Sequence, residues 1–447
     1  MTDTPTAPGN KKPLGIWICT ALVIGNMIGS GIFLLPANLA EYGGISVFGW
    51  VIGAGGAMCI ALVLARLATI IPKAGGHYAY TRNAFGDFAA FLVGWGYWIS
   101  LMSGNAAISI AMVGYLGVFF PVLTSSPALT IFVAIAAIWV LTWVNMMGVR
   151  NAGFVVVLTV ILKLLPLVAI ATLGLLYFDA GNFEPFVVGD RSMFAALTAT
   201  VPLTLWAFLG LESATIPANE VDCPAKIIPK ATILGVVFTG VVYILATVAV
   251  MGILPVADVA SSTAPFADAA GAVWGEWAAY AVAAGAAVSC FGALNGWILL
   301  TGQFPLAVAR DKLFPGVFGK VSRRGTPILG LVIGALLVTV MVSFVETSQT
   351  GNWLAELFKI AILLATFTSL VPYAFSAMAE LVIFARDREQ FRGQRLLGAS
   401  LIAVVAFFFS IWAIGGAGAE TVYWGTIFLL LGLPIYVWML RGRHRSG

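Results

Sequence analysis

Two ionisable side chains lie inside stretches of sequence that are otherwise apolar. Glu212 belongs to an apolar segment of roughly residues 194–217, and Lys163 lies near the middle of another, roughly 151–177. A charge at the centre of a bilayer costs about 2.5–3.5 kcal/mol on insertion scales, so such a residue indicates a functional site by default. For Glu212 two interpretations stay open: a gate linked to substrate, or a structural hydrogen-bond network with Ser213 and the first apolar segment.

Lys163 allows three interpretations. Because desolvation favours the neutral form of a lysine, Lys163 could give up and regain a coupling proton. It could instead hold the first apolar segment by donating to backbone carbonyls near Gly25. Snorkelling to an interface fits less well, since Lys163 lies far from both ends of its segment. We favour the structural role, because the neighbouring Val, Ile and Leu side chains offer no polar path to water.

The first apolar run, roughly 14–40, is interrupted by Gly25-Asn26-Met27-Ile28-Gly29-Ser30-Gly31-Ile32. Each glycine costs roughly 1 kcal/mol against alanine inside a helix, so this stretch predicts an unwound backbone. In hydrocarbon, such backbone survives only where protein buries it or where it lines a cavity, and its freed N–H and C=O groups can then bind a ligand. The alternative is a helix-packing face, because Gly25 and Gly29 are four residues apart.

A second interruption falls in the sixth apolar segment, where Trp206-Ala207-Phe208-Leu209-Gly210-Leu211-Glu212-Ser213-Ala214 carries a glycine, an acid and a serine. Breaks in the first and sixth segments indicate two five-span repeats of opposite topology, whose broken helices meet near the membrane midplane. The second half-helix, starting near Gly29-Ser30-Gly31, would offer N–H groups to a carboxylate. Carbonyls from Ala207 to Gly210 would accept from an ammonium group. We therefore expect a preformed cavity between the breaks, walled by the third, eighth and tenth segments.

The composition places these stretches in a membrane. Of 447 residues, 61% are hydrophobic and 9% are charged, and the mean hydropathy is +1.01. Soluble domains carry about 25% charged residues, so we predict an all-α integral membrane protein. The predicted apolar segments number twelve, at roughly 14–40, 45–71, 87–120, 127–147, 151–177, 194–217, 231–254, 277–306, 326–345, 353–384, 396–415 and 421–440. The first repeat would cover 14–177 and the second 194–384, with two further spans in 396–441.

The distribution of basic residues predicts the orientation. With the N-terminus inside, 19 of the 23 Lys and Arg residues fall in cytoplasmic connections or tails, as the positive-inside rule requires. Both ends are therefore predicted to be cytoplasmic, residues 1–13 as a disordered tail and 442–447 as a basic tail. The net charge of +4 is dispersed over loops and indicates no nucleic-acid partner. The four cysteines lie singly, and neither a metal nor a cofactor is predicted.

Four motifs carry a resemblance that covers nearly the whole chain. They are Gly25 to Pro36 (GNMIGSGIFLLP), Gly75 to Tyr80 (GGHYAY), Thr204 to Ala214 (TLWAFLGLESA) and Gly296-Trp297. With them the sequence resembles the amino acid–polyamine–organocation (APC) superfamily, and within it the bacterial basic amino acid and polyamine antiporters, such as arginine/agmatine and putrescine/ornithine exchangers. The resemblance implies the LeuT fold, a five-plus-five inverted repeat with discontinuous helices 1 and 6, plus two extra helices.

The same resemblance implies a function. A member of this branch would be a secondary active transporter that exchanges cationic amino acids or their amines across the cytoplasmic (inner) membrane of a bacterium by alternating access. The alternative is a proton-coupled symporter or exchanger of a broader, neutral amino acid set, because Lys163 departs from the antiporter branch and resembles the proton-coupled and heteromeric branches. The further partners predicted are protons, membrane lipid and a second copy of the chain in a homodimer. The clustered side chains of an enzyme and the filter or charge rings of a channel are missing from the sequence.

The predicted substrate site combines the two breaks with three side chains. A tryptophan face attracts a cation by roughly 0.5–2 kcal/mol, and an asparagine offers both a donor and an acceptor. In the arginine exchanger the residues that match Trp206 and Trp297 line the pocket, and the one that matches Asn105 contacts the distal group; a packing or interface role is the alternative. The full predicted set is Asn26, Ile28, Gly29, Ser30, Gly31, Asn105, Trp206, Ala207, Phe208, Gly210 and Trp297.

Gating or coupling is predicted for Lys163, Glu212, Tyr78 and Tyr97. The resemblance implies a tyrosine of the inner pathway at Tyr78 or Tyr80, in the connection after Gly75-Gly76. Tyr97 is a candidate gate on the outer side. All three tyrosines could instead be interfacial aromatics. His77 is interpreted as a loop residue near the cytoplasmic surface and not as a proton relay.

Overall fold

The computed structural model describes residues 15–71, 75–148, 152–212, 221–343, 352–387 and 396–443. Within these ranges the regular secondary structure is helical. The α-helices, in chain order, are α1 (Ile16–Met27), α2 (Gly31–Ala40), α3 (Ser46–Ile70), α4 (His77–Leu116), α5 (Pro127–Met147), α6 (Ala152–Leu173), α7 (Met193–Trp206), α8 (Pro224–Ile253), α9 (Val256–Ser261), α10 (Pro265–Trp274), α11 (Glu276–Arg310), α12 (Ile328–Ser343), α13 (Trp353–Arg386), α14 (Leu396–Gly416), α15 (Ala419–Leu430) and α16 (Gly432–Arg443).

Helices long and apolar enough to cross a membrane dominate the fold. Among the described residues there are eight: Ile16–Ala40, Ser46–Ile70, His77–Leu116, Pro127–Met147, Pro224–Ile253, Glu276–Arg310, Trp353–Arg386 and Ala419–Arg441. Shorter apolar helices are Lys163–Tyr177, Met193–Trp206, Ile328–Ser343 and Ser400–Gly416. The predicted class, an all-helical membrane protein, is confirmed. The predicted tail 1–13, and residues 444–447 of the predicted basic tail, lie outside the described residues.

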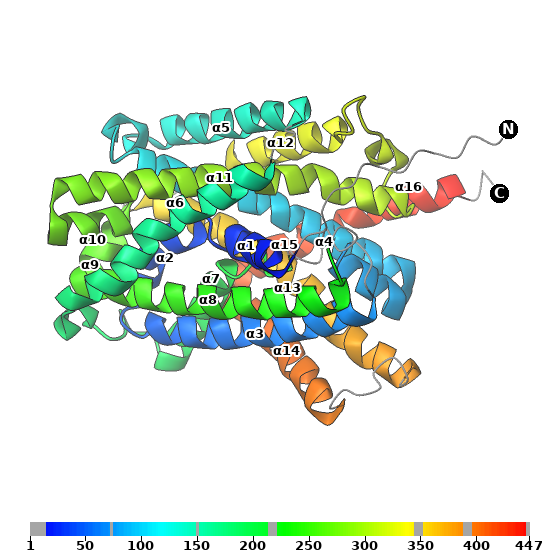
Figure 1. Cartoon of the computed structure of the whole chain (residues 1–447), viewed down its shortest axis with the longest axis horizontal. Coiled ribbons are helices and arrows are strands. Elements are labelled where there is room, and N and C mark those ends of the chain that lie inside the picture. Colours follow the sequence, from blue (N-terminus) through cyan, green and yellow to red (C-terminus); the bar gives the residue numbers. More distant parts are fainter. Residues whose placement is uncertain are drawn as a thin grey trace.

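The helices run mostly along the long axis of the molecule (Figure 1). α3 and α8 pack side by side along one edge with α14 against α3, while α5, α11 and α12 pack together on the opposite side. α9 and α10 lie at one end, called the α10 end below, and α16 lies toward the other, called the α16 end. α2 lies in the interior, where all ten of its residues are buried.

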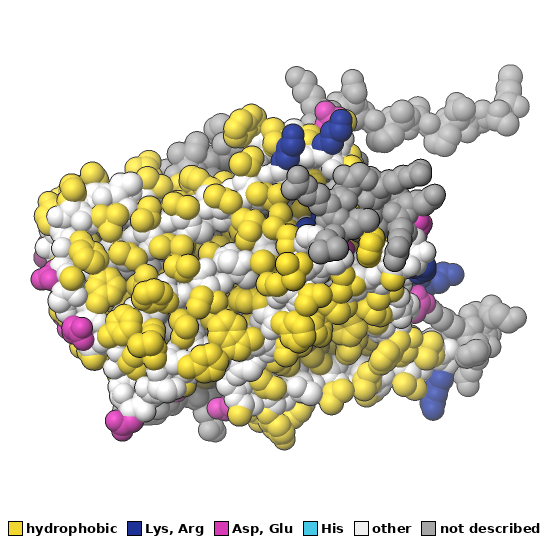
Figure 2. All heavy atoms as spheres, turned by 90° about the horizontal axis from the view of Figure 1, so that it is seen from below, with side chains coloured by type: hydrophobic (Ala, Val, Ile, Leu, Met, Phe, Trp, Pro, Cys, Tyr) yellow, Lys and Arg dark blue, Asp and Glu magenta, His cyan; other side chains and the backbone are white. Residues whose placement is uncertain are grey.

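Large apolar side chains cover much of the surface, and several polar and charged side chains are buried within the hydrophobic core. Figure 2 shows hydrophobic side chains across the middle of the molecule and Lys and Arg side chains toward the α16 end. Large apolar side chains are exposed, including Trp17 at 79% and Leu176 at 79%, whereas Asn105, Lys163 and Glu212 are at most 4% exposed. This pattern fits a protein whose solvent is hydrocarbon and whose polar groups must be satisfied inside.

α4 differs most from its prediction. It begins at His77, whereas the apolar pattern predicted a span that starts at 87. Gly86 has φ 82° and ψ −172°, a backbone conformation that glycine adopts readily, and it separates a short arm, 77–85, from the long part of the helix. The arm is helical, but it is too polar for a hydropathy pattern to identify it as part of the span. Tyr78 and Tyr80, predicted in a connection, therefore lie on a helix, and both are buried.

Candidate functional site

The first break is the short segment between α1 and α2, residues 28–30, and side chains from other helices bind its carbonyls. The Lys163 ammonium donates to the carbonyl of Ile28 at 2.5 Å and also to that of Gly25. The Tyr243 hydroxyl donates to the carbonyl of Met27 at 2.7 Å. The first N–H groups of α2, from Gly31 onward, have no carbonyl of their own helix to bind. The carbonyls of Gly25, Met27 and Ile28 are thus occupied, and the start of α2 presents N–H donors at a positive helix end.

The second break is residues 207–212, which follow the end of α7. N–H groups here bind carbonyls three residues back, as from Phe208 to Leu205 at 2.9 Å and from Leu209 to Trp206 at 3.1 Å. Such tight turns leave the regular helical pattern, in which the bond goes four residues back. The Phe208 ring packs against Trp50 and Tyr243, at 6.1 and 5.7 Å between centroids, so Phe208 can serve a site only through its backbone.

The two breaks touch each other, and glycines make the contact possible. Gly210 has φ +98°, and a Cβ atom on it would lie 3.2 Å from the backbone and side chain of Asn26. A Cβ atom on Gly31 would lie 3.1 Å from Trp206 Nε1 and 3.2 Å from the Cα atom of Ala207. Any side chain at these positions would push the two broken helices apart. The meeting of the breaks, expected from the sequence, is present in the structure.

The two predicted tryptophans face each other beside the breaks. Their ring centroids are 5.6 Å apart, and Trp206 is 4% and Trp297 6% exposed. A Cβ atom on Gly104 would lie 2.6 Å from the Trp297 ring and 3.0 Å from the Trp206 ring. The next residue, Asn105, donates from Nδ2 to Thr301 Oγ1 at 2.9 Å. The described side chains pack tightly at this place. A preformed cavity between the breaks therefore stays a prediction.

Three predicted site residues carry buried polar atoms that have no hydrogen-bond partner in the part of the chain that the structure describes. They are Ser30 Oγ, Asn105 Oδ1 and Trp206 Nε1. Buried polar groups are nearly always paired, so unpaired ones need a specific reason, such as a ligand or a water molecule. Here the three atoms belong to the first break, to α4 and to the end of α7. A ligand at the meeting of the breaks would supply partners of both kinds, donor and acceptor.

Glu212 is held by two tyrosines from different helices. Its carboxylate accepts from the Tyr97 hydroxyl at 2.8 Å and from the Tyr373 hydroxyl at 3.1 Å. The network expected with Ser213 lies outside the described residues. Nothing in the local sequence distinguishes Tyr373 as a functional residue, since it is one tyrosine in a long apolar segment. Glu212 thus links the second break to α4 and α13.

The interpretation of His77 as a loop residue is wrong. His77 is 3% exposed and lies in the first turn of α4. Its ring packs against Tyr97 and Tyr373, at 5.6 and 5.0 Å between centroids, and Nδ1 lies 3.3 Å from Ser376 Oγ. Gly75 and Gly76, both with positive φ (115° and 51°), precede His77. A histidine therefore lies against both tyrosines that bind Glu212.

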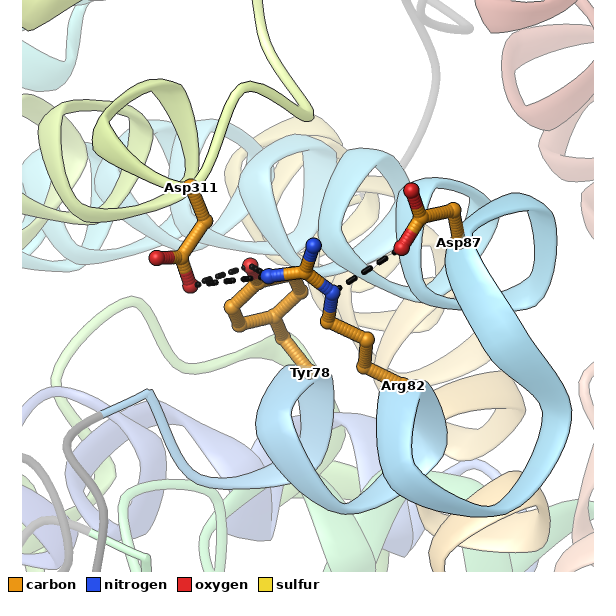
Figure 3. Close-up of polar contacts among 4 residues, drawn as sticks. All are labelled: Tyr78, Arg82, Asp87 and Asp311. Atoms are coloured by element: carbon orange, nitrogen blue, oxygen red, sulfur yellow. Dashed lines mark hydrogen bonds and ion pairs between the residues drawn. The ribbon is translucent and has the colours of Figure 1, made fainter.

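Tyr78 belongs to a polar cluster at the start of α4 (Figure 3). Its hydroxyl donates to Asp311 Oδ2 at 2.5 Å, and Arg82 forms ion pairs with Asp87 at 2.9 Å and Asp311 at 3.5 Å. Arg82 reaches across the Gly86 kink to Asp87, and Asp311 follows the end of α11. The charged side chains are 38–51% exposed, so water screens the ion pairs.

Ion pairs also fasten α13 near both of its ends. Glu380 binds Arg66 of α3 with two hydrogen bonds, at 2.5 and 3.0 Å, and is 2% exposed. Near the other end, the Lys359 ammonium lies 2.5 Å from Glu41 Oε2, just after α2. Neither pair was among the predicted site residues. The Arg66–Glu380 pair is the more buried of the two, and it is costly to break because the Glu380 charge would be left without this partner.

Broken helices that meet deep in a helical membrane protein, with polar groups gathered at the breaks, define a secondary transporter. The chain belongs to the amino acid permease family, whose pattern matches residues 14–440. It is 37% identical to the cadaverine/lysine antiporter of Escherichia coli K12 over 374 residues, 83% of each chain. It is 32% identical to the putrescine transporter PotE of Haemophilus influenzae over 432 residues, 96% of this chain and 97% of the relative. PotE of Escherichia coli K12 is also 32% identical, over 96% of each chain.

Proposed function

We propose that this permease exchanges cationic amino acids and their amines across the inner membrane of a bacterium. The observation that carries the proposal is a set of buried polar atoms without a partner among the described residues, on Ser30 and Trp206 at the two breaks and on Asn105 of the neighbouring helix α4. The relatives support the substrate class, since one is a cadaverine/lysine antiporter and another a putrescine transporter. The similarity covers 83% of the first relative and 97% of the second.

The site supports a specific pose for an amino acid. Its carboxylate would bind the N–H groups at the start of α2, from Gly29 to Gly31, where the helix end is positive. Its α-ammonium would bind carbonyls between Ala207 and Gly210. The side chain would then pass the ring faces of Trp206 and Trp297, which attract cations, toward Asn105. An amine without a carboxylate would engage only the last two parts of this site.

We also propose the finer architecture from which alternating access would follow. The eight long and four shorter apolar helices support twelve spans among the described residues. Breaks after α1 and α7 support a five-plus-five inverted repeat, 14–177 and 194–384, followed by two spans in 396–441. The gathering of Lys and Arg toward the α16 end supports a cytoplasmic α16 end, with both termini inside (Figure 2). Two further predictions, assembly into a homodimer and coupling of transport to protons, remain proposals.

In that orientation Tyr97 belongs to the inner side of the site, which revises the outer-side gate predicted from sequence. The reason is that Tyr97 packs against His77 in the first turn of α4, and α4 begins at the α16 end. Parting of Glu212 from Tyr97 and Tyr373 would then be one step of inward opening. The step requires no chemistry, only the exchange of two hydrogen bonds for contacts with water or substrate.

The alternative function, proton-linked transport of neutral amino acids, depends on Lys163. The structure favours the structural role for this lysine, because its ammonium binds two carbonyls of the first break. If Lys163 lost its proton, the neutral amine would keep two N–H donors, but its hydrogen bonds to the two carbonyls would lose the strength that the charge gives them. The alternative nevertheless makes a distinct prediction, that a pH gradient alone drives uptake.

Counterflow in proteoliposomes tests the proposal. Vesicles loaded with unlabelled lysine should take up labelled lysine, cadaverine or putrescine, whereas empty vesicles should not. Uptake of labelled leucine into empty vesicles, driven by an imposed pH gradient and without lysine exchange, would establish the alternative instead. Trp206→Ala and Asn105→Ala should weaken substrate binding more than folding. Unchanged affinity with lowered thermal stability in both variants would show that they are packing residues.

A further inference from the structure

One face of α13 carries a series of buried polar contacts. Four of its side chains, spaced three or four residues apart, each meet a polar side chain from another part of the chain: Ser369 meets Ser100, Tyr373 meets Glu212, Ser376 meets His77 and Glu380 meets Arg66. This spacing keeps the four on one side of the helix. All four are at most 2% exposed, so they form a buried polar column along α13.

The His77 ring contacts three side chains of this region and has one nitrogen without a partner. Nδ1 lies 3.3 Å from Ser376 Oγ, and Nε2 is buried with no partner in the part of the chain that the structure describes. The ring also packs against Tyr97 and Tyr373, the two tyrosines that donate to Glu212. We call Glu212, Tyr97 and Tyr373 the inner gate, because their parting is the proposed step of inward opening. A titratable ring therefore touches both tyrosine donors of the inner gate.

Among the described residues, the charged groups around His77 come from α3, α4, α13 and the second break. Glu212 of the inner gate is the acid whose charge acts on the imidazole. Glu380, one turn beyond Ser376, is paired with Arg66. The other charged or titratable residues at the start of α4 and in its contacts are Tyr78, Tyr80, Arg82, Asp87, Asp311 and Arg386. Tyrosines are neutral near pH 7, and the ion pairs of this group are exposed to water. A charge on His77 therefore acts mainly on Glu212.

We propose that His77 is a proton-binding site on the cytoplasmic side of the inner gate, and that its protonation favours inward opening. The inference rests on the proposed function and deepens it, because it names what regulates the proposed gate. Histidine is the side chain whose charge normally changes between about pH 5 and 8. The proton comes from cytoplasmic water and returns to it, so the step makes and breaks one N–H bond and needs no other reactant.

The direction of the effect follows from the unpaired nitrogen. In a neutral imidazole one nitrogen carries no proton, whereas in the protonated ring both nitrogens donate. In the closed arrangement Ser376 can accept from Nδ1–H, but Nε2–H has no acceptor among the described residues. A buried charge with an unmet donor is costly. The donor is satisfied when the Glu212 carboxylate turns from the tyrosines toward the ring or when water enters, and both changes loosen the inner gate.

Ser376 suits both charge states of His77. A serine hydroxyl has one proton to donate and two lone pairs with which to accept. Ser376 can therefore donate to an unprotonated Nδ1 or accept from Nδ1–H, and the ring keeps its place when the proton binds. Ser376 is thus a positioning residue. Ser376→Ala should shift the pH at which exchange changes without removing the proton site.

Counterflow of labelled cadaverine tests the inference, because alkyl ammonium groups stay charged over the pH range used. In vesicles with uniformly oriented protein and fixed external pH, lowering the internal pH from about 8 to about 6 should speed exchange by about five-fold or more, the lower end of typical coupling between sites. His77→Asn replaces the ring with an amide that does not titrate, and it should reduce this ratio to about two-fold or less. The matched control is Thr81→Val, a buried threonine of the same arm whose hydroxyl has no partner among the described residues. It should keep the wild-type ratio.

Nuclear magnetic resonance of purified protein labelled at histidine gives a second readout that needs no transport. The chain has two histidines, His77 and His444, so His77→Asn assigns the signals. The His77 signal should titrate between about pH 5 and 8, with a midpoint that shifts in Glu212→Gln. A His77 signal that does not change over this range would overturn the inference.

The transport results separate this inference from the proposed function. Cadaverine exchange that does not respond to internal pH would overturn the inference while the proposed function stands. The inference would also be overturned if His77→Asn kept the full response and Glu212→Gln abolished it, which would place the proton site at Glu212. If the wild type exchanges no cationic substrate at all, the proposed function fails, and the inference about its gate fails with it.

Discussion

The two breaks differ in what holds them. At the first break the protein supplies donors to freed carbonyls: an ammonium from α6 and a hydroxyl from α8. At the second break the protein supplies an acceptor instead, the Glu212 carboxylate. Tyrosine hydroxyls from α4 and α13 donate to it. The first break is thus fixed at its carbonyl side and leaves N–H groups for a ligand. The second is fastened to helices on the far side of the site, through bonds that a ligand or a domain movement could replace.

This difference assigns separate tasks to the breaks. Carbonyls that are already bound by Lys163 and Tyr243 need no substrate to be stable, so the first break can keep its shape when the site is empty. The Glu212 carboxylate accepts hydrogen bonds from Tyr97 and Tyr373, which belong to other helices, so a movement of those helices would break these bonds. We expect variants of the first break to change affinity and variants of the second to change gating. The predictions below test that division.

Lys163→Met should have the largest effect. It retains an apolar side chain of similar length but leaves the carbonyls of Gly25 and Ile28 without their donor, at about 1–3 kcal/mol for each unsatisfied group. Thermal unfolding should occur at clearly lower temperature, and substrate affinity should fall because α1 and α2 lose their fixed relation. The remaining exchange should keep the pH response of the wild type.

Loss of the pH response with affinity retained would instead make Lys163 the coupling proton site. Wild-type stability, affinity and pH response together would return it to a lysine without a specific role. Glu212→Gln in the same assay separates the two titratable candidates, because it removes the acid and leaves the ammonium of Lys163 in place.

Gly210→Ala should have the next largest effect, on binding above all. Its φ of +98° disfavours a side chain, and the new Cβ atom would meet the backbone and side chain of Asn26 at 3.2 Å. Relief requires that the two breaks separate, which distorts the proposed site. Gly189→Ala is the matched control, because Gly189 also has positive φ, +72°, but has no atom within 4 Å of the added Cβ. Equal loss of transport in both variants would show that backbone strain, and not the contact between the breaks, is responsible.

Tyr373→Phe and Tyr243→Phe compare the breaks directly, since each removes one hydroxyl donor. Tyr373→Phe weakens the hold on Glu212, and it should raise the leak of labelled lysine from vesicles that have no substrate outside. Tyr243→Phe leaves the carbonyl of Met27 unpaired, and it should lower affinity about ten-fold without a leak. The division of tasks would be wrong if both variants changed affinity and leak in the same proportion.

The breaks themselves could be predicted from sequence, because glycine content and an intramembrane acid are local signals. Donation from Lys163 to carbonyls near Gly25 was one of the interpretations drawn from the sequence, since a buried ammonium needs acceptors and the first break frees carbonyls. Tyr373, Tyr243 and Ser376 could not be found, because their roles depend on which helices pack together across more than a hundred residues of chain. His77 was misplaced for a related reason. The polar arm of α4 has the composition of a loop, and its burial depends on packing against other helices, which the local sequence does not reveal.

The smallest effect is expected at the cluster of Tyr78, Arg82, Asp87 and Asp311, which contrasts with the buried breaks. Its charged groups are 38–51% exposed, and exposed ion pairs contribute about 0–1 kcal/mol. Asp311→Asn should therefore lower thermal stability only slightly, and the difference from wild type should shrink at high salt. Asp87→Asn is the control, because it removes an ion pair of Arg82 but leaves the contact between the α4 arm and the end of α11. If Asp311→Asn alone slows exchange while both variants remain equally stable, the cluster regulates movement of the arm. A stability loss as large as that of Lys163→Met would show that exposure does not separate this cluster from the breaks.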